Sequence, residues 1–182
     1  MTPSPLHAHL AFLFRFDAWA NRAVAAALAS DAARGSGVDP VRVGEAARLF
    51  AHLTRAAEVW LGRVEGTEAA GLPIWPDDTD VTASAARGAR AAAGWQARLR
   101  AASDAGLGRG VRYTNSRGER FETALAEIAA HVVTHGSHHR GQVARLLREA
   151  GLAPPALDLI AYARSPERRP RDLGRPRLGP AA

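Results

Sequence analysis

The chain has 182 residues, 47% of them hydrophobic, and its abundance of alanine, leucine and arginine favours a single all-helical domain of ordinary size. It contains no cysteine, which excludes disulfides, zinc–thiolate sites and a cysteine nucleophile. No apolar run approaches about 18 residues and no signal-peptide pattern is present, so we expect a cytoplasmic protein that does not enter a membrane.

The net charge of +6 is distributed unevenly along the chain. Residues 164–182 contain six arginines against Glu167 and Asp172, and they carry +4 of that charge. Nucleic-acid binding needs basic side chains clustered on a folded face, so the composition does not favour a nucleic acid as partner. Because this Arg/Pro-rich segment offers little apolar area to bury, we expect a domain over 1–163 followed by a disordered tail over 164–182.

The first two helices are predicted from apolar periodicity and from their ends. The first should run over 5–30, with an apolar face wider than a four-helix core needs. The second should begin at Pro40 with Asp39 as its N-cap, and Gly66 should end it. The excess apolar face of the first helix predicts a further buried surface, such as a homodimer contact.

The rest of the chain completes a bundle. A proline-rich connector over 71–78 is too irregular for a helix, and an alanine-rich third helix is expected over 82–103. Residues 108–121 suit a short β-hairpin or extended ribbon. A fourth helix should cover 122–150, and a brief helix should cover 156–163. The predicted fold is all-α: a four-helix bundle with this ribbon before the fourth helix and a short C-terminal helix.

Four of the seven histidines fall within residues 131–139 of the fourth predicted helix. One stripe of this helix, in which intervals of three and four residues alternate, consists of Leu125, Ile128, Val132, His135, His139, Gln142 and Leu146. Such a stripe faces the centre of a bundle. Since an imidazole buried without a partner costs a few kcal/mol, something must satisfy the three consecutive polar positions, and a divalent metal ion would do so.

His135 and His139 project from one helix face about 6 Å apart, so a third ligand must come from elsewhere. His7 and His9 lie near a terminus and are spaced for different faces. His52 flanks the apolar side of the second helix and could lean into the bundle, although on the residues alone a partly buried surface histidine is the better interpretation. Three imidazoles would leave coordination positions open for water or substrate.

Other interpretations of the polar positions stay open. His135 and His139 could be buried histidines bonded to neighbouring side chains or water. His131 could replace His139 as the partner of His135, or support a ligand by a hydrogen bond. Gln142 could form a hydrogen bond beside the metal or only close the polar layer. Trp75, in the connector, could line a pocket or a dimer contact.

Two familiar metal patterns do not match. A zinc peptidase of the helical type needs a glutamate directly after its first histidine, where this chain has Gly136. A di-iron carboxylate protein needs two Glu-x-x-His motifs and more inward carboxylates. The nearest pair is Glu127 and His131, which are four residues apart, and no second pair of this kind occurs on another predicted helix.

Several segments together resemble the DinB-like (damage-inducible B) family of metalloproteins. The most specific is Val132-Val-Thr-His135-Gly-Ser-His-His139-Arg-Gly-Gln142, followed by Leu146-Leu147 and Gly151. Residues 51–66, 16–21 and 154–160 are similar to the family's second helix, first-helix motif and segment after the fourth helix. The resemblance covers about residues 6 to 163.

The resemblance implies a four-helix bundle in which His52, His135 and His139 bind one divalent ion, zinc or nickel ahead of iron or manganese. It also implies a homodimer, since many relatives form one. Some branches activate a low-molecular-weight thiol at the metal for transfer, isomerisation or ring opening. We therefore expect a metal-dependent hydrolase or thiol-dependent transferase or isomerase acting on a small molecule. The alternative is a non-catalytic, stress-associated metal-binding protein.

Overall fold

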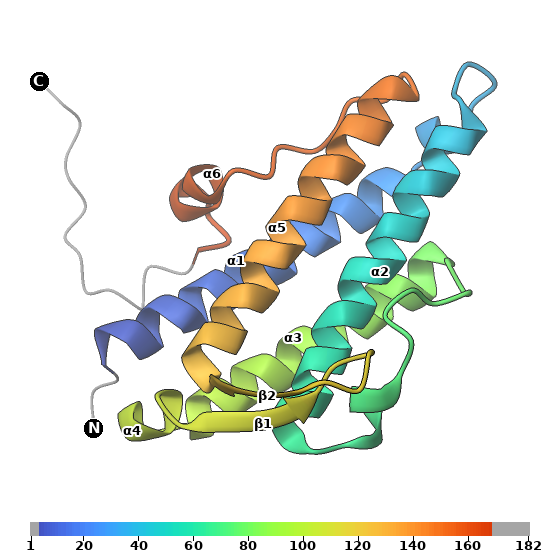
Figure 1. Ribbon diagram of the computed structural model, residues 1–182. Coiled ribbons are helices and arrows are strands. Elements are labelled where there is room, and N and C mark those ends of the chain that lie inside the picture. Colours follow the sequence, from blue (N-terminus) through green and yellow to red (C-terminus); the bar gives the residue numbers. More distant parts are fainter. Residues whose placement is uncertain (1–3, 169–182) are drawn as a thin grey trace, which may run out of the picture.

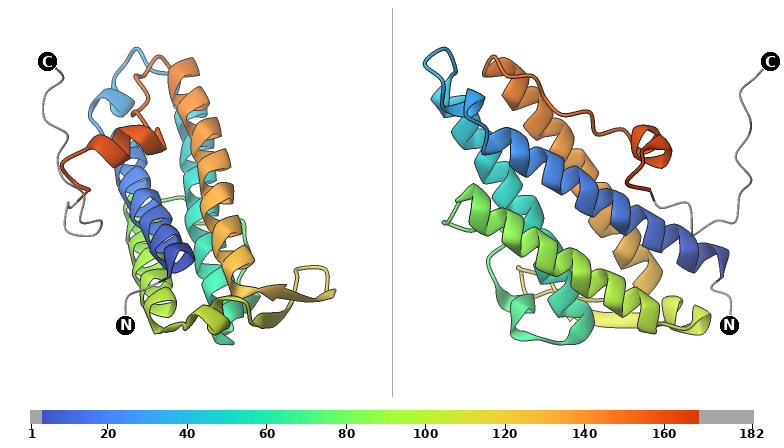
Figure 2. Two further views of the ribbon diagram at one scale, coloured as in Figure 1. Left: turned by 90° about the vertical axis from the view of Figure 1, so that its left-hand side faces the viewer. Right: turned by 180° about the vertical axis from the view of Figure 1, so that it is seen from behind.

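A computed structural model describes residues 4–168, and its four long helices form the predicted bundle (Figure 1). They are α1 (Pro5–Leu28), α2 (Pro40–Glu65), α3 (Val81–Ala101) and α5 (Leu125–Glu149). Figure 2 shows that α1 and α5 run in one direction and α2 and α3 in the other. The most extensive contacts join α2 to α5 and to α3, so α2 lies between these two helices. None of the described helices is both long and apolar enough to cross a membrane.

The ends of α2 follow the local sequence signals. The Asp39 carboxylate accepts hydrogen bonds from the backbone N–H groups of Val41 and Arg42, and Pro40 occupies the first turn, where no N–H is needed. Gly66 ends the helix with φ of 68°, in the left-handed region that favours glycine. The connector then forms the short 3-10 helix η2 (Glu68–Gly71) and returns along the bundle to α3. Both predicted ends of α2 are confirmed.

The predicted ribbon is an antiparallel hairpin of β1 (Gly110–Thr114) and β2 (Arg120–Ala124), in which Tyr113 pairs with Phe121. The predicted start of the fourth long helix at residue 122 is wrong, because residues 122–124 pair with β1 and α5 begins only at Leu125. The first helix ends at Leu28, two residues earlier than predicted. Two further short helices, η1 (Ala32–Arg34) and α4 (Asp104–Leu107), were not predicted.

The C-terminal helix α6 (Leu159–Arg164) packs across α1 (Figure 1). It begins later than the predicted 156, because the chain stays extended up to the N-cap residue Asp158. Its buried Tyr162 lies against three aromatic rings of α1 at centroid distances of 5.4–5.9 Å, those of Phe12, Phe16 and Trp19. Arg168 donates to the Ala163 carbonyl. The predicted disorder of the tail falls mostly on residues 169–182, which lie outside the described residues.

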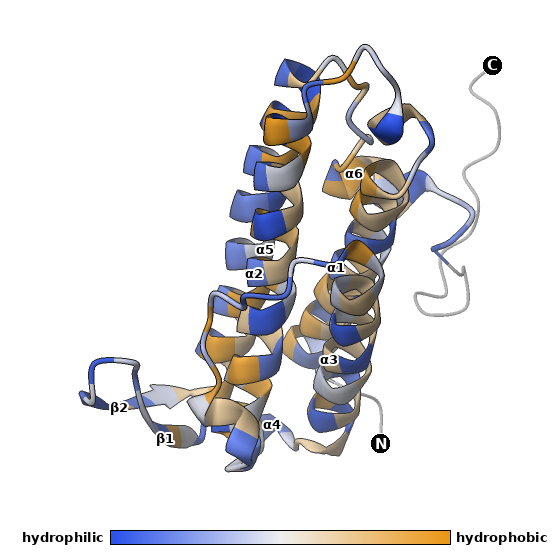
Figure 3. Cartoon of the chain, turned by 90° about the vertical axis from the view of Figure 1, so that its right-hand side faces the viewer, coloured by the Kyte–Doolittle hydropathy of each residue, from blue (hydrophilic) through white to orange (hydrophobic). Residues whose placement is uncertain are grey.

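The core fills the space between the four long helices, and Figure 3 shows their hydrophobic faces turned inward and their polar faces outward. Near the hairpin end, Phe14 and Trp95 stack with ring centroids 5.1 Å apart, and the Trp95 indole N–H donates to the Ala57 carbonyl. At the opposite end, a second cluster surrounds Phe50 and Leu147. The candidate site lies on α2 and α5 between these two clusters.

Candidate metal centre

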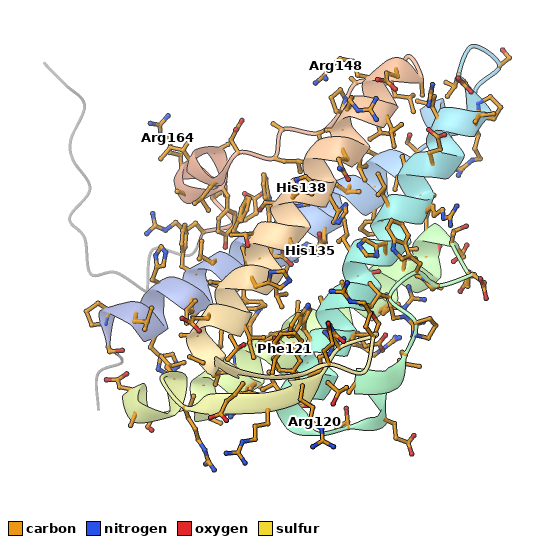
Figure 4. All side chains as sticks on the ribbon, in the orientation of Figure 1. Arg120, Phe121, His135, His138, Arg148 and Arg164 are labelled. Atoms are coloured by element: carbon orange, nitrogen blue, oxygen red, sulfur yellow. The ribbon has the colours of Figure 1, made fainter. Side chains whose placement is uncertain are left out.

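The three histidines of the predicted metal set lie together between α2 and α5, which run antiparallel and side by side (Figure 1). His52 comes from α2, and His135 and His139 come from successive turns of α5. One ring nitrogen of each lies within 4.8 Å of the others, so the group could hold a metal ion. Figure 4 shows His135 midway along α5, with His138 further along the same helix.

The two α5 histidines face each other with their Nε2 atoms 3.1 Å apart. Metal–nitrogen bonds of about 2.0–2.1 Å place two ligand nitrogens roughly 3.3 Å apart in a tetrahedral site. The observed separation is therefore close to that of two ligands of one ion. The His52 ring approaches both edge-on, at centroid distances of 5.2 Å from His135 and 4.6 Å from His139.

Two of the rings are oriented by hydrogen bonds on the side away from the other histidines. His52 Nδ1 lies 3.0 Å from the Ile74 carbonyl, and His139 Nδ1 lies 2.7 Å from Oε1 of Gln142. A carbonyl oxygen accepts only, so each Nδ1 carries the proton and each Nε2 keeps its lone pair. Imidazole ligands in metal proteins are held in this way, with the second ring nitrogen donating to an oxygen.

The connector covers the His52 ring. The indole of Trp75 stacks on it with centroids 3.8 Å apart and planes 12° apart, although 47% of Trp75 is exposed. Beside this stack is a cavity of about 490 Å³, here called the Trp75 cavity, which is lined by Glu45, Arg48, Leu49, Trp75, Gln142, Arg145 and Leu146. Trp75 contacts His52 and Gln142 contacts His139, so a small molecule in the Trp75 cavity would lie directly beside the three histidines. Of the two roles that the sequence left open for Trp75, the structure thus shows the lining of a pocket.

The surroundings keep the three imidazoles neutral. The pKa of His135 is lowered to about 3, mainly by burial and additionally by the neighbouring His139 and His52. Burial also lowers the pKa of His52 and of His139, while the bonds to Ile74 and Gln142 act in the opposite direction. A neutral imidazole is the form that ligates a metal, so the group needs to lose no proton at neutral pH.

The predicted position of the histidines at the bundle centre is wrong. Leu125, Ile128, Val132 and Leu146 of the stripe are buried, but His135, His139 and Gln142 are only half-buried. At the same height along α5, the bundle centre is occupied by Arg140, which lies on the neighbouring face of the helix and is only 1% exposed. Its guanidinium donates to Asp17 and Asn21 of α1, at 2.5 and 2.9 Å. His135, His139 and Gln142 therefore lie on a side of α5 that is partly exposed to solvent, while His52 is buried.

The two other histidines of the cluster lie outside the group. His131 is exposed, its ring lies 5.6 Å from that of His135, and it packs edge-on against Trp60 of α2. His138 is also exposed and lies 3.1 Å from the side-chain nitrogen of Gln142. The side-chain oxygen of Gln142 lies 2.7 Å from His139 Nδ1. Gln142 therefore forms a hydrogen bond with a histidine of the group, which is one of the two roles that the sequence left open for it.

Sequence reasoning missed two groups that position the site. The Ile74 carbonyl was not predicted as the partner of His52, because a backbone oxygen leaves no mark in the sequence. Asp17 and Asn21 were not predicted as partners of Arg140. Their i, i+4 spacing on the apolar side of a helix was the signal that could have revealed them.

Comparisons with known proteins agree with this geometry. A model described as the DinB family matches residues 13–171, a range that includes all three histidines. Protein DinB of Bacillus subtilis (strain 168) is 40% identical over 42 residues, which cover 23% of this chain and 24% of that protein. The matched part thus spans about a quarter of the curated relative. No solved structure matches the chain.

Proposed function

Because the chain belongs to the DinB family, we propose that it binds one divalent metal ion through His52, His135 and His139. The observation that carries the proposal is the convergence of three neutral imidazoles whose ligand nitrogens lie within 4.8 Å. Imidazole donors suit zinc and nickel, and also bind iron, while manganese prefers carboxylate oxygens. Zinc or nickel is therefore the favoured ion, ahead of iron or manganese.

We further propose that the metal centre is catalytic, as a hydrolase or as a thiol-dependent transferase or isomerase. A bound ion with an open position would polarise a carbonyl or lower the pKa of water or a thiol. The half-buried rings of His135 and His139 leave the site accessible, and the Trp75 cavity offers space beside it. Glu45, the carboxylate that lines this cavity, accepts a hydrogen bond from Arg42 at 2.8 Å, so it is paired and is not a candidate general base. The protein thus provides binding and orientation, and the nucleophile would be activated at the metal.

The alternative is a non-catalytic, stress-associated metal-binding protein. Turnover distinguishes the two functions: the zinc- or nickel-loaded protein is incubated with low-molecular-weight thiols and electrophiles, and with panels of esters and amides. The catalytic proposal expects a reaction that His135→Ala abolishes and that the exposed His138→Ala leaves intact. Absence of any turnover, together with spectroscopy that finds no exchangeable ligand on the ion, would favour the binding protein.

We also propose a cytoplasmic location, which rests on the sequence pattern, and a homodimer, which rests on the family resemblance and on the apolar face of the first helix. The wide apolar face of α1 supports it less than the sequence suggested, because α6 covers part of that face within the same chain. Light scattering at micromolar concentration tests it, and a mass near 19.3 kDa for the monomer would overturn it.

A further inference from the structure

Arg63 is buried near the hairpin and has no acidic partner in the part of the chain that the structure describes. Only 8% of Arg63 is exposed, and its Nε has no hydrogen-bond partner in the structure. The guanidinium lies over the rings of Trp60 and Tyr113, at 4.5 and 5.6 Å from their centroids. Among the described residues, no carboxylate lies within ion-pair distance of it. A buried arginine is normally paired, so this one lacks the anion that such a position calls for.

Arg63 lines a cavity of about 630 Å³, here called the Arg63 cavity, between the end of α2, the connector and the hairpin. Its lining residues are Arg63, Gly66, Thr67, Ala70, Gly71, Leu72, Pro73, Ile74, Arg112, Tyr113, Thr114, Asn115 and Ser116. They include two arginines and no acid. Arg112 is neutralised by Glu122 at 2.8 Å, so the uncompensated charge in the cavity is that of Arg63. A volume of this size accommodates a small organic molecule.

The Arg63 cavity is connected to the metal site through shared elements. Ile74 lines it, and the carbonyl of the same residue accepts the hydrogen bond from His52. Arg63 follows His52 by eleven residues, which is about three helical turns, so both project from one face of α2 with about 16 Å between them along the axis. Long side chains of a helix point back toward its N-terminus, and the Arg63 guanidinium accordingly lies over Trp60, one turn nearer His52.

We propose that the Arg63 cavity binds the carboxylate of a small organic acid. Trp60 and Tyr113 contact each other and lie on the same side of the guanidinium, so the N–H groups on its other edges can donate to a planar carboxylate. The acid would be the substrate or the thiol cosubstrate of the metal centre, with its reactive end toward His52. This second part rests on the proposed catalytic function, whereas the binding of the carboxylate does not.

The test titrates the full chain, without added metal, with glutarate, with the neutral analogue glutaramide and with inorganic phosphate, and follows two-dimensional nitrogen–proton NMR spectra. Glutarate should shift the Arg63 Nε–H and the amides of the lining residues in a saturable way, and glutaramide should not. Arg63→Gln should weaken glutarate binding at least tenfold. Arg100→Gln, which removes an exposed arginine of α3, should change it less than twofold.

Several outcomes would overturn the proposal. They are equal binding of glutarate and glutaramide, tighter binding of phosphate, or Arg63→Gln behaving like Arg100→Gln. If Arg63→Gln fails to fold, Arg63→Lys keeps the charge without the planar fork, and the expected result is weaker glutarate binding. In the wild-type protein, a change in the Arg63 Nε–H chemical shift on addition of glutarate tests the contact between Arg63 and the carboxylate without any substitution. His52→Ala should retain glutarate binding while losing metal, so the carboxylate site and the metal site can fail separately.

Discussion

The Nδ1 atom of His139 lies 2.7 Å from Oε1 of Gln142, one turn further along α5. The amide nitrogen of the same glutamine lies 3.1 Å from His138 Nε2. With its oxygen toward His139, the amide accepts the Nδ1 proton and directs Nε2 toward His135, whose own Nε2 lies 3.1 Å away. Gln142, for which the sequence left two roles open, therefore sets the tautomer of a proposed ligand.

Gln142→Ala should weaken metal binding about 10- to 100-fold, because removing the group that orients a ligating histidine typically costs that much affinity. Competition with a chromophoric chelator measures the change. His138→Ala is the matched control, since it removes the other neighbour of the amide and leaves the bond to His139, and it should change affinity less than about threefold. Equal effects of the two substitutions would show that Gln142 does not act through His139.

Two glycines of α2 should respond oppositely to alanine. A Cβ at Gly62 would lie 2.6 Å from the backbone nitrogen of Ala70, and the backbone cannot turn away as a side chain can. Gly62→Ala should therefore cost about 1–3 kcal/mol and shift the connector that carries Ile74, weakening metal binding as well. Gly44 has open space around it, and Gly44→Ala should stabilise by about 0.5–1 kcal/mol. Urea unfolding of both variants checks the difference, and a neutral Gly62→Ala would contradict the close packing.

Arg140→Met should destabilise the fold by about 3–5 kcal/mol, because it leaves the buried Asp17 carboxylate without its cation. Arg145→Met on the same helix removes an exposed pair with Glu149 and should cost only about 0.3–0.5 kcal/mol. Denaturant unfolding at pH 7 compares them. A loss below about 1 kcal/mol for Arg140→Met would mean that Asp17 is hydrated or protonated in the folded chain.

The stability of the metal-free protein should fall as the pH decreases below 6.5. In the unfolded chain His135 has the ordinary pKa of 6.5, while in the folded chain its pKa is about 3. Between these values the unfolded chain binds more protons, so acid favours unfolding, and the contribution is complete only above 6.5. The lowered values also extend metal binding to a lower pH than ordinary histidines would allow.

Thermal unfolding between pH 7 and 4 measures this dependence, and His135→Gln should flatten it. His138→Ala, which removes an exposed histidine, should leave the slope unchanged. A wild-type slope equal to that of His135→Gln would contradict the lowered pKa.

The parts of the fold with strong local signals could be predicted from the sequence. The ends of α2 at Pro40 and Gly66 depend on capping and backbone geometry, which act over a few residues. The start of α5 could not be placed, because pairing of residues 122–124 with β1 overrides helical periodicity and is a tertiary effect. Periodicity likewise identified the face that carries His135 and His139. It could not decide whether this face or the adjoining one with Arg140 meets the bundle centre, since that depends on how α1 packs.

In the candidate site, too, the local features could be predicted from the sequence and the features that depend on tertiary packing could not. The i, i+4 spacing of His135 and His139 follows from helix geometry alone and needed no structure. The proximity of His52 depends on the packing of α2 against α5; its place beside the apolar side of α2 allowed it, and the family resemblance favoured it. The support from Ile74 and Trp75 arises from an irregular connector, whose course no periodic pattern encodes.

Metal-dependent thermal stability, compared across single histidine variants, tests the central claim most directly. If His52, His135 and His139 hold one ion, the free energy of unfolding should rise by about 2.7 kcal/mol at a hundredfold excess of free metal over Kd. Replacing any of the three with alanine should abolish the rise, while His131→Ala and His138→Ala should keep most of it. If His131→Ala abolishes the rise and His139→Ala does not, the α5 pair is His131 and His135. If metal stabilises none of these proteins, the three histidines are not a metal site.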